Sequence, residues 1–343
     1  MLVAIFTIHE ANNIGAYLQA HSLLTVVKQI GVESVYIGKK VQTDVHNSSI
    51  IAKVMKYLRA GDVKKLIFKS RSAAVYQEIQ SAFPIINMAA NSKLDCAIIG
   101  SDEVWNIRSK NFTHYPAYFG HGINADKIIA YAPCGNGVTA DDFHNIMPDE
   151  KFQNFSALSA RDADTQQCVK TVSGKEVVKV VDPTMLIDDF GIEFPACPIN
   201  EDFILVYSYG IDDRCIPQIR QFAKQKAMPL ISVGTYNSWC KRNVVANPWE
   251  FLGYLRAAKY VIVSTFHGTI LSIKLNKQFA CYAGNSSKVK DILDFYHLQD
   301  RNVHQSDELT GLFDQPIDYN PVNQIIESSR EASLAYLKNA MGI

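Results

Sequence analysis

A histidine in a predicted strand-to-helix turn is the residue of this sequence best suited to chemistry. His267 lies within residues 264–268, between the β-branched run 260–263 and a stretch with helical spacing of its apolar residues. In a parallel sheet such a turn lies at the carboxyl end of a strand, where ligands collect and the helix start directs N–H groups outward. His267 could therefore meet an anion or transfer protons near neutral pH. The alternative is that it caps the helix or fills the core.

A carboxylate follows a second predicted strand. Asp102 comes just after the buried run 94–99, with Glu103 and Trp105 close behind. A carboxylate beside an aromatic ring suits a sugar site, because the acid binds or deprotonates hydroxyls while the ring covers C–H groups. The structural alternative, which does not exclude the first, is that Asp102 caps a helix beginning at Glu103.

An arginine follows a third predicted strand. Arg161 comes directly after residues 155–160. Its guanidinium suits a bidentate grip on a carboxylate or phosphate. Paired with Asp162, it could equally form a surface ion pair that contributes little.

The first predicted strand, 2–7, leads into a polar turn that contains Asn13 and Gly15. This turn is not a GxGxxG sequence, so a dinucleotide fingerprint is absent. Gly15 would let a ligand approach the backbone at the start of the next helix, and the alternative is a plain tight turn.

Strands and helices alternate along the chain, which is typical of parallel α/β sheets. The predicted strands are 2–7, 34–37, 94–99, 128–132, 155–160 and 177–181 in a first series, and 203–207, 230–233, 260–263 and 279–282 in a second. The predicted helices include 164–171, 215–226, 248–258, 288–296 and 321–341, and residues 42–90 read as mostly helical. Two basic clusters, 53–59 and 64–71, are interpreted as solvated helix faces without a binding role.

Length and spacing predict two domains. A chain of 343 residues is long for a single core. Residues 189–202 contain Gly191, Pro195 and Pro198 without periodicity and are interpreted as a linker. We expect a Rossmann-like domain over 1–190, a second over 200–318, and a last helix within 320–343 that returns to the first domain. The two parallel sheets would then face a common cleft.

Composition excludes several classes of protein. Lys plus Arg equals Asp plus Glu at 34 each, which argues against a general nucleic-acid or anionic-membrane binder. The seven cysteines form no CxxC pair and fit reduced core thiols, and Cys134 is interpreted as a wall residue. No metal-ligand cluster, basic leader or apolar run of about 20 residues is present. We expect a cytoplasmic protein that needs no metal or cofactor.

Several short segments, in this order, resemble the polysaccharide pyruvyl transferase family. They include residues 13–19, 100–106, 131–135, 159–162, 182–186, 247–252, 257–261, the Ser-Thr-Phe-His-Gly turn at 264–268, and 288–301. Each is weak alone, and their common order carries the resemblance over most of the chain. It implies a GT-B-like fold and transfer of a carboxyethylidene group from phosphoenolpyruvate to two hydroxyls of a sugar.

The resemblance, taken with the strand-end positions, gives each candidate residue a role. His267 and Asp102 are expected to be catalytic. Arg161, Ser264, Thr265 and Gly268 are expected to bind the donor, and Asn13, Gly15, Trp105 and Asn106 the acceptor. The acceptor would be a sugar or a lipid-linked oligosaccharide of exopolysaccharide synthesis, with at most peripheral membrane contact and an open oligomeric state.

One position departs from the family pattern. Some members carry an arginine two positions before the turn histidine, where this chain has Thr265. Either Lys241, Arg242 or Lys288 replaces that cation, or the donor differs. The other functions considered are a nucleotide-sugar glycosyltransferase of GT-B fold and a non-enzymatic glycan-binding component of an envelope assembly complex.

Overall fold

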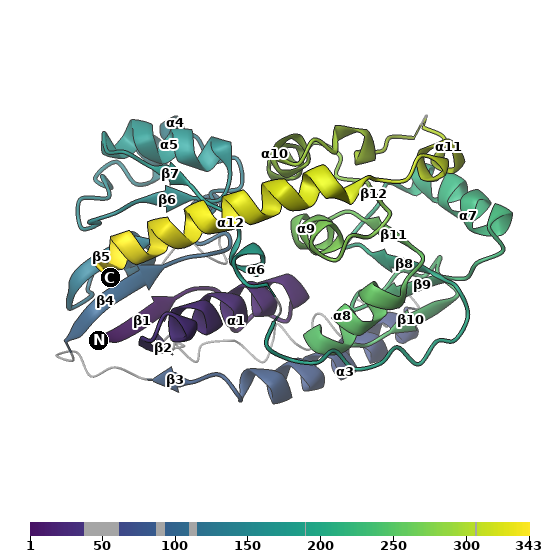
Figure 1. Cartoon of the computed structure of the whole chain (residues 1–343), viewed down its shortest axis with the longest axis horizontal. Helices are drawn as coiled ribbons and strands as arrows, with labels where there is room; N and C mark the ends of the chain where they lie inside the picture. Colours follow the sequence, from purple (N-terminus) through teal and green to yellow (C-terminus); the bar gives the residue numbers. More distant parts are fainter. Residues whose placement is uncertain (38–61, 87–92, 110–114, 189, 306) are drawn as a thin grey trace.

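Two parallel sheets with the same strand order form the frame of the molecule (Figure 1). The computed structural model describes residues 1–37, 62–86, 93–109, 115–188, 190–305 and 307–343. Within these ranges the first sheet has the order β3-β2-β1-β4-β5, with β1 Leu2–Phe6, β2 Glu33–Ile37, β3 Ile85–Ile86, β4 Leu94–Ile99 and β5 Ala125–Ala130. The second has the order β10-β9-β8-β11-β12, with β8 Ile204–Tyr207, β9 Leu230–Val233, β10 Arg242–Val244, β11 Tyr260–Val263 and β12 Phe279–Cys281.

Helices separate the strands and cover the sheets. The longer ones are α1 Ile14–Gln29, α3 Val63–Gln80, α5 Ala163–Ser173, α7 Ile216–Gln225, α8 Pro248–Ala257, α9 Phe266–Lys274, α10 Ser287–Phe295 and α12 Tyr319–Met341. The shorter ones are α4 Ala140–Ile146, α6 Pro183–Leu186, α11 Leu309–Asp314 and the 3₁₀ turns η1 Pro116–Phe119, η2 Asp213–Cys215 and η3 Gln299–Arg301. Every residue of β8 and β9 is buried, as expected for apolar runs in a parallel sheet covered on both faces. The predicted α/β class with two parallel sheets is confirmed.

The strand order reverses once in each sheet. β1 pairs with both β2 and β4, and β8 pairs with both β9 and β11. Ligands of open parallel sheets bind beyond the carboxyl ends of the strands at such switch points. The loops after β1, β4, β8 and β11 are therefore the segments that this fold brings to a site.

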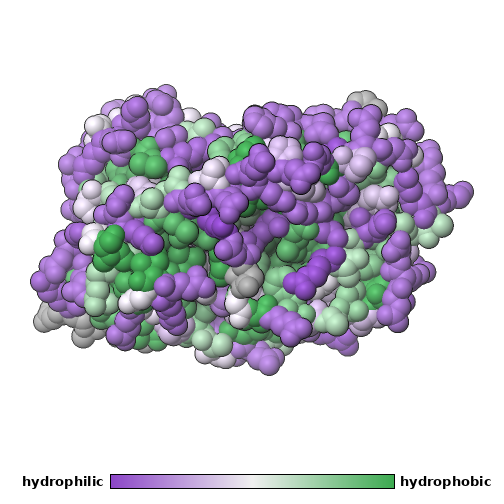
Figure 2. Space-filling model, in the orientation of Figure 1, coloured by the Kyte–Doolittle hydropathy of each residue, from purple (hydrophilic) through white to green (hydrophobic). Residues whose placement is uncertain are grey.

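Helix α12 runs from the second sheet back along the first (Figure 1). Its Ser333 Oγ accepts a hydrogen bond from the Val181 N–H at 3.1 Å, and its Tyr336 hydroxyl donates to the Ala130 carbonyl at 2.9 Å. Figure 2 shows hydrophilic residues along the rim of this face and apolar residues gathered along its middle. Among the described residues, no helix combines the length and apolarity that crossing a bilayer requires.

Several predicted elements differ from the observed ones. Residues 85–86 form strand β3 instead of helix, and residues 242–244 form strand β10 instead of loop. Of the predicted strands 155–160 and 177–181, only β6 Ser159–Ala160 and β7 Val178–Lys179 are formed, as a separate two-stranded sheet. These strands therefore do not belong to the main first sheet. The predicted basic cluster 53–59 lies outside the described residues, and the cluster 64–71 lies on α3.

Candidate active site

One cavity of about 280 Å³ is lined by residues from both sheets' switch points. Asn13 follows β1, Asp102 follows β4, Tyr209 follows β8 and His267 follows β11. The full lining is Asn13, Asp102, Glu103, Arg161, Tyr207, Tyr209, Ser264, Thr265, Phe266, His267, Ser286, Lys288 and Val289. Six of the ten residues predicted from sequence therefore lie on one cavity: Asn13, Asp102, Arg161, Ser264, Thr265 and His267.

The turn before helix α9 fixes the position of His267. Thr265 is the N-cap of α9, and its Oγ1 accepts a hydrogen bond from the Gly268 N–H at 2.9 Å. A side chain at Gly268 would lie within 2.9 Å of the Tyr207 ring and of Val263, so this residue lets the helix pack closely on the sheet. Gly268 does not line the cavity, and its N–H is already bound by Thr265. Ser264, at the strand end, exchanges a hydrogen bond of 2.7 Å with the Ser208 hydroxyl.

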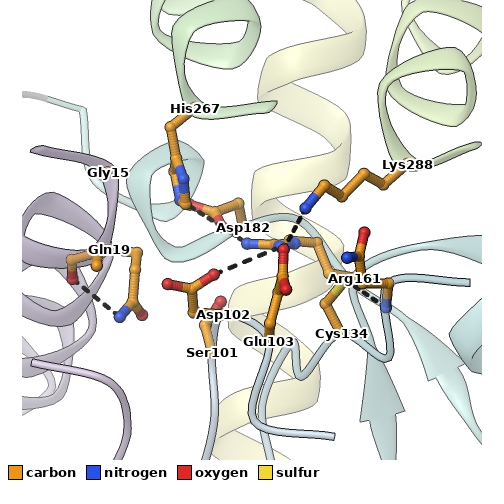
Figure 3. Close-up of polar contacts among 12 residues, drawn as sticks. Gly15, Gln19, Ser101, Asp102, Glu103, Cys134, Arg161, Asp182, His267 and Lys288 are labelled. Carbon is orange, nitrogen blue, oxygen red and sulfur yellow. Dashed lines mark hydrogen bonds and ion pairs between the residues drawn. The ribbon is translucent and has the colours of Figure 1, made fainter. Parts of the chain in front are cut away.

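Gly15 packs against the imidazole of His267 and does not line the cavity (Figure 3). A Cβ atom at Gly15 would lie 2.1 Å from His267 Cγ and 2.2 Å from Nδ1. The predicted close approach to this backbone is therefore made by the histidine ring and not by a ligand. Asn13 is the N-cap of α1, and its Oδ1 accepts from the Gly15 and Ala16 N–H groups at 2.8 and 3.1 Å.

A buried carboxylate, Asp182, connects His267 with Arg161 (Figure 3). Arg161 Nη1 donates to Asp182 Oδ2 at 2.8 Å, and His267 Nε2 lies 3.7 Å from the same oxygen. Burial alone would raise the pKa of Asp182, but His267 and Arg161 outweigh it and hold this pKa well below its ordinary value. Asp182 therefore stays ionised behind the cavity, beside His267.

His267 and Arg161, which line the cavity, each carry a buried nitrogen without a hydrogen-bond partner in the described part of the chain. His267 is only 9% exposed, and its Nε2 has no hydrogen-bond partner among the residues that the structure describes. The Arg161 guanidinium lies 4.1 Å from the centre of the Phe266 ring and 3.9 Å from Asp102 Oδ1. Its Nε is likewise without a partner in the described part of the chain. Buried polar atoms without partners are rare, so both groups are suited to binding a ligand.

An ion pair between Glu103 and Lys288 crosses the cavity from the first sheet to the second (Figure 3). Glu103 follows β4, and Lys288 lies in the first turn of α10. Burial would raise the pKa of Glu103, but Lys288 and a hydrogen bond of 2.9 Å from Asn106 Nδ2 lower it overall. Of the three cations proposed to replace the family's arginine, Lys288 lines this cavity. Lys241 lines other hollows, and Arg242 lies exposed on strand β10.

Two predictions about the loop after β4 are wrong. Trp105 is fully buried, donates its indole N–H to the Tyr118 carbonyl at 2.8 Å and packs on Phe152, so it cannot stack on a sugar in the cavity. Asp102 has a φ of 66°, in the left-handed region, whereas a helix N-cap requires extended backbone. No helix begins at Glu103, so Asp102 is not a cap.

Asn106 and Cys134 do not line the cavity either. Asn106 is buried and its amide holds Glu103, so it acts through that carboxylate. Burial raises the pKa of the Cys134 thiol to about 12, which keeps it protonated and unreactive. The described residues contain no group of three or more side chains able to hold a metal ion.

Two contributors to the site were not predicted from sequence: Asp182 and Tyr209. Tyr209 follows a strand at a switch point, so the strand-end rule that placed Asp102 and Glu103 at the ligand edge could have found it. Asp182 lies between β7 and α6 and precedes Pro183, and an aspartate at such a boundary indicates the helix cap that it also forms. Its contact with His267, 85 positions away in the chain as 267 minus 182, has no local signal.

The comparisons with solved structures concern the fold. A putative UDP-N-acetylglucosamine 2-epimerase from Listeria monocytogenes matches with a TM-score of 0.55 and 9% identity, covering 98% of this chain and 95% of that one. S. aureus MnaA, in a co-structure with UDP, matches with a TM-score of 0.51 and 11% identity, covering 98% and 96%. UDP-GlcNAc 2-epimerase from Neisseria meningitidis, bound to UDP-GlcNAc, matches with a TM-score of 0.51 and 10% identity, covering 98% and 99%. At these identities the likeness shows a shared GT-B-like fold and nothing of the substrate.

The comparisons with sequences concern the family. A search among curated proteins found no match. The family model described as polysaccharide pyruvyl transferase matches residues 13–286, which include every cavity residue except Lys288 and Val289. Because this match covers most of the 343 residues, the chain belongs to the polysaccharide pyruvyl transferase family.

Proposed function

We propose that this member of a transferase family moves a pyruvyl group from phosphoenolpyruvate to two hydroxyls of a glycan, as a carboxyethylidene ketal. The observation that carries the proposal is the single cavity in which His267, Arg161 and Lys288 lie together with Asp102. It combines a protonatable group, two cations and a carboxylate. These are the groups that a small polyanionic donor and an attacking hydroxyl require.

The proposed reaction balances without a cofactor. One sugar hydroxyl attacks C2 of phosphoenolpyruvate while the methylene carbon takes a proton and becomes a methyl group. The C2–oxygen bond to phosphate then breaks, and the second hydroxyl forms the ketal. One hydroxyl proton ends on the methyl carbon and the other on the released phosphate.

We also propose a proton donor and a proton acceptor for this scheme. His267 lines the cavity and faces Asp182, and histidine exchanges protons near neutral pH, so we assign His267 as the acid that protonates the methylene carbon. Asp102 lines the same cavity and carries a carboxylate, so we assign it as the base for the attacking hydroxyl.

The donor anion would bind between the two sheets. Arg161 Nε is without a partner among the described residues, and Lys288 could turn from Glu103 toward a phosphate. Lys288 would then supply the positive charge that the family's arginine provides where this chain has Thr265. Thr265 lines the cavity, and its hydroxyl, which accepts the Gly268 N–H, would still donate a hydrogen bond to the donor.

The acceptor would enter beside Asn13 and Tyr209, which both line the cavity. We propose a sugar or lipid-linked oligosaccharide of exopolysaccharide synthesis, met in the cytoplasm with no more than peripheral membrane contact. Tyr209 is 61% exposed and offers the aromatic face that Trp105 does not.

The proposal is tested by product analysis. The protein is incubated with phosphoenolpyruvate and a panel of oligosaccharides, and phosphate release is compared with the gain of a carboxyethylidene group by mass spectrometry and of a ketal methyl signal by NMR. We expect the two in equal amounts and a loss of about 10²–10⁴-fold in rate in His267→Ala. Ketal formation that is unchanged in His267→Ala, or consumption of a UDP-sugar in place of phosphoenolpyruvate, would contradict it.

A further inference from the structure

A second hollow, separate from the candidate active site, lies between helix α3 and the edge of the second sheet. It has a volume of about 540 Å³ and is lined by side chains of α3 and of residues 236–245, around strand β10. Figure 1 shows α3 beside the second sheet, although α3 precedes β3 of the first sheet in the chain. Both halves of the chain therefore build this hollow.

The described lining of the hollow carries an excess of positive charge. Lys64, Arg71 and Lys241 line it, and no carboxylate of the described residues does. Among the residues that the structure describes, none of the three makes an ion pair or side-chain hydrogen bond, whereas Lys179 and Lys226 pair with carboxylates at 2.8 and 3.0 Å. The chain as a whole has equal numbers of acidic and basic residues, so the excess is local.

The carboxylate of Asp62 lies next to the hollow. Burial, together with the negative charge of Asp62, raises the pKa of Tyr236. As the cap of α3, Asp62 also accepts a hydrogen bond from the Lys65 N–H through its Oδ1, at 3.3 Å. Asp62 is therefore engaged at the helix end, and it is not among the lining residues. A basic site of this kind attracts an anion.

An aromatic floor accompanies the charges. The rings of Phe68 and Tyr236 meet at 5.7 Å and 60°, and Phe68 is buried. Lys64, Phe68 and Arg71 lie at helical spacing on one face of α3, together with Ile67, which is 48% exposed. Cations around apolar rings suit a ligand that joins a phosphate to a sugar ring.

We propose that this hollow binds the phosphate or diphosphate group of a phosphorylated sugar acceptor, an assignment that rests on the proposed function. Helix α3 extends from the hollow toward the active-site cavity: burial and, to a smaller extent, Tyr209, which lines that cavity, raise the pKa of its residue Tyr76. From Phe68 to Tyr76 the helix advances about 12 Å, a length that one or two sugar units span. The basic cluster 64–71 was interpreted from sequence as a solvated helix face without a binding role, and this proposal gives it one.

Direct binding tests the assignment with inorganic diphosphate and with glucose 1-phosphate as probes. Lys64→Glu/Lys241→Glu is compared with Lys151→Glu/Lys170→Glu, which changes the net charge equally at exposed positions elsewhere. At fixed ionic strength we expect binding of both probes to weaken about tenfold or more in the first variant and to stay within about twofold of native in the second. Unchanged binding in the first variant, or equal weakening in both, overturns the assignment.

Phosphoenolpyruvate binding, measured on the same variants, separates this inference from the proposed function. The hollow variant should bind phosphoenolpyruvate as the native protein does, because its substitutions lie outside the active-site cavity. If the protein binds diphosphate at the hollow but does not bind phosphoenolpyruvate, the proposed donor is wrong and the anion site stands. If it binds phosphoenolpyruvate and Lys64→Glu/Lys241→Glu leaves the diphosphate affinity unaltered, only the anion site is wrong.

Discussion

At the scale of single residues, the site depends on what surrounds His267 more than on the histidine itself. Gly15 leaves the space that the imidazole fills, and Asp182 supplies the charge behind it. Neither residue needs to touch a substrate for these effects. Under the proposed function both act as positioning residues, and a separate prediction follows for each.

Gly15→Ala should displace the His267 ring, because the new Cβ would lie 2.1 Å from His267 Cγ. A misplacement of about 1 Å can lower a catalytic rate about 10²-fold. We expect this loss in kcat with a smaller change in KM for phosphoenolpyruvate. Gly311→Ala, on α11 with nothing within 4 Å of the added carbon, serves as control and should keep the native rate. A native kcat in Gly15→Ala would contradict the contact.

Asp182→Asn should destabilise the protein by about 3–5 kcal/mol at neutral pH, because it leaves Arg161 buried without its charge partner. The pKa of Asp182 is lowered in the folded protein, so its contribution is present above about pH 4 and is lost as pH falls toward the folded value. The free energies of unfolding of native and variant should therefore converge in acid.

Urea unfolding at pH 7 and pH 3 measures this difference. Asp149→Asn, at an exposed position, should follow the native protein at both pH values. A difference between native and Asp182→Asn that stays constant with pH would contradict the assignment.

At the scale of elements, helix α9 is short and depends on its cap. Thr265→Ala removes the acceptor of the Gly268 N–H bond, and loss of such a cap costs about 0.5–2 kcal/mol. Thr265→Ser keeps the hydroxyl and should stay near native in urea unfolding. An equal loss in both variants would show that the methyl group, and not the cap, carries the effect.

Most elements could be predicted from sequence because their patterns are local. Buried β-branched runs marked β4, β8 and β11, and Asn247 before Pro248 marked the start of α8, which it caps. β3 is only two residues long and β10 carries Arg242 and Asn243, so neither has an apolar pattern to detect.

The site could be predicted only as far as strand ends define it. That rule placed His267, Asp102 and Arg161 on one cavity. It gives the position of a residue but not the direction of its side chain, so Trp105 was assigned to the cavity although its ring packs in the core. The contact between Asp182 and His267 joins segments of the two halves of the chain and needs the tertiary structure.

At the scale of the whole molecule, the candidate site is formed by residues from both halves of the chain, which the two sheets hold next to each other. Lys288 from α10 meets Glu103 from the first sheet, and α1 of the first half packs on α8 and α9 of the second. Family membership and a shared GT-B-like fold do not choose the donor, because the structural relatives include proteins solved with UDP. We propose phosphoenolpyruvate as the donor on the basis of the charged residues of the cavity alone.

Calorimetric titration with phosphoenolpyruvate, run beside UDP, tests this account most directly. The native protein should bind phosphoenolpyruvate saturably and UDP not at all, with binding about tenfold or more weaker in Lys288→Met and in His267→Ala. Lys170→Met, at an exposed position on α5, should bind as the native protein does. Saturable binding of UDP without binding of phosphoenolpyruvate would contradict the proposed donor and favour a nucleotide-sugar enzyme.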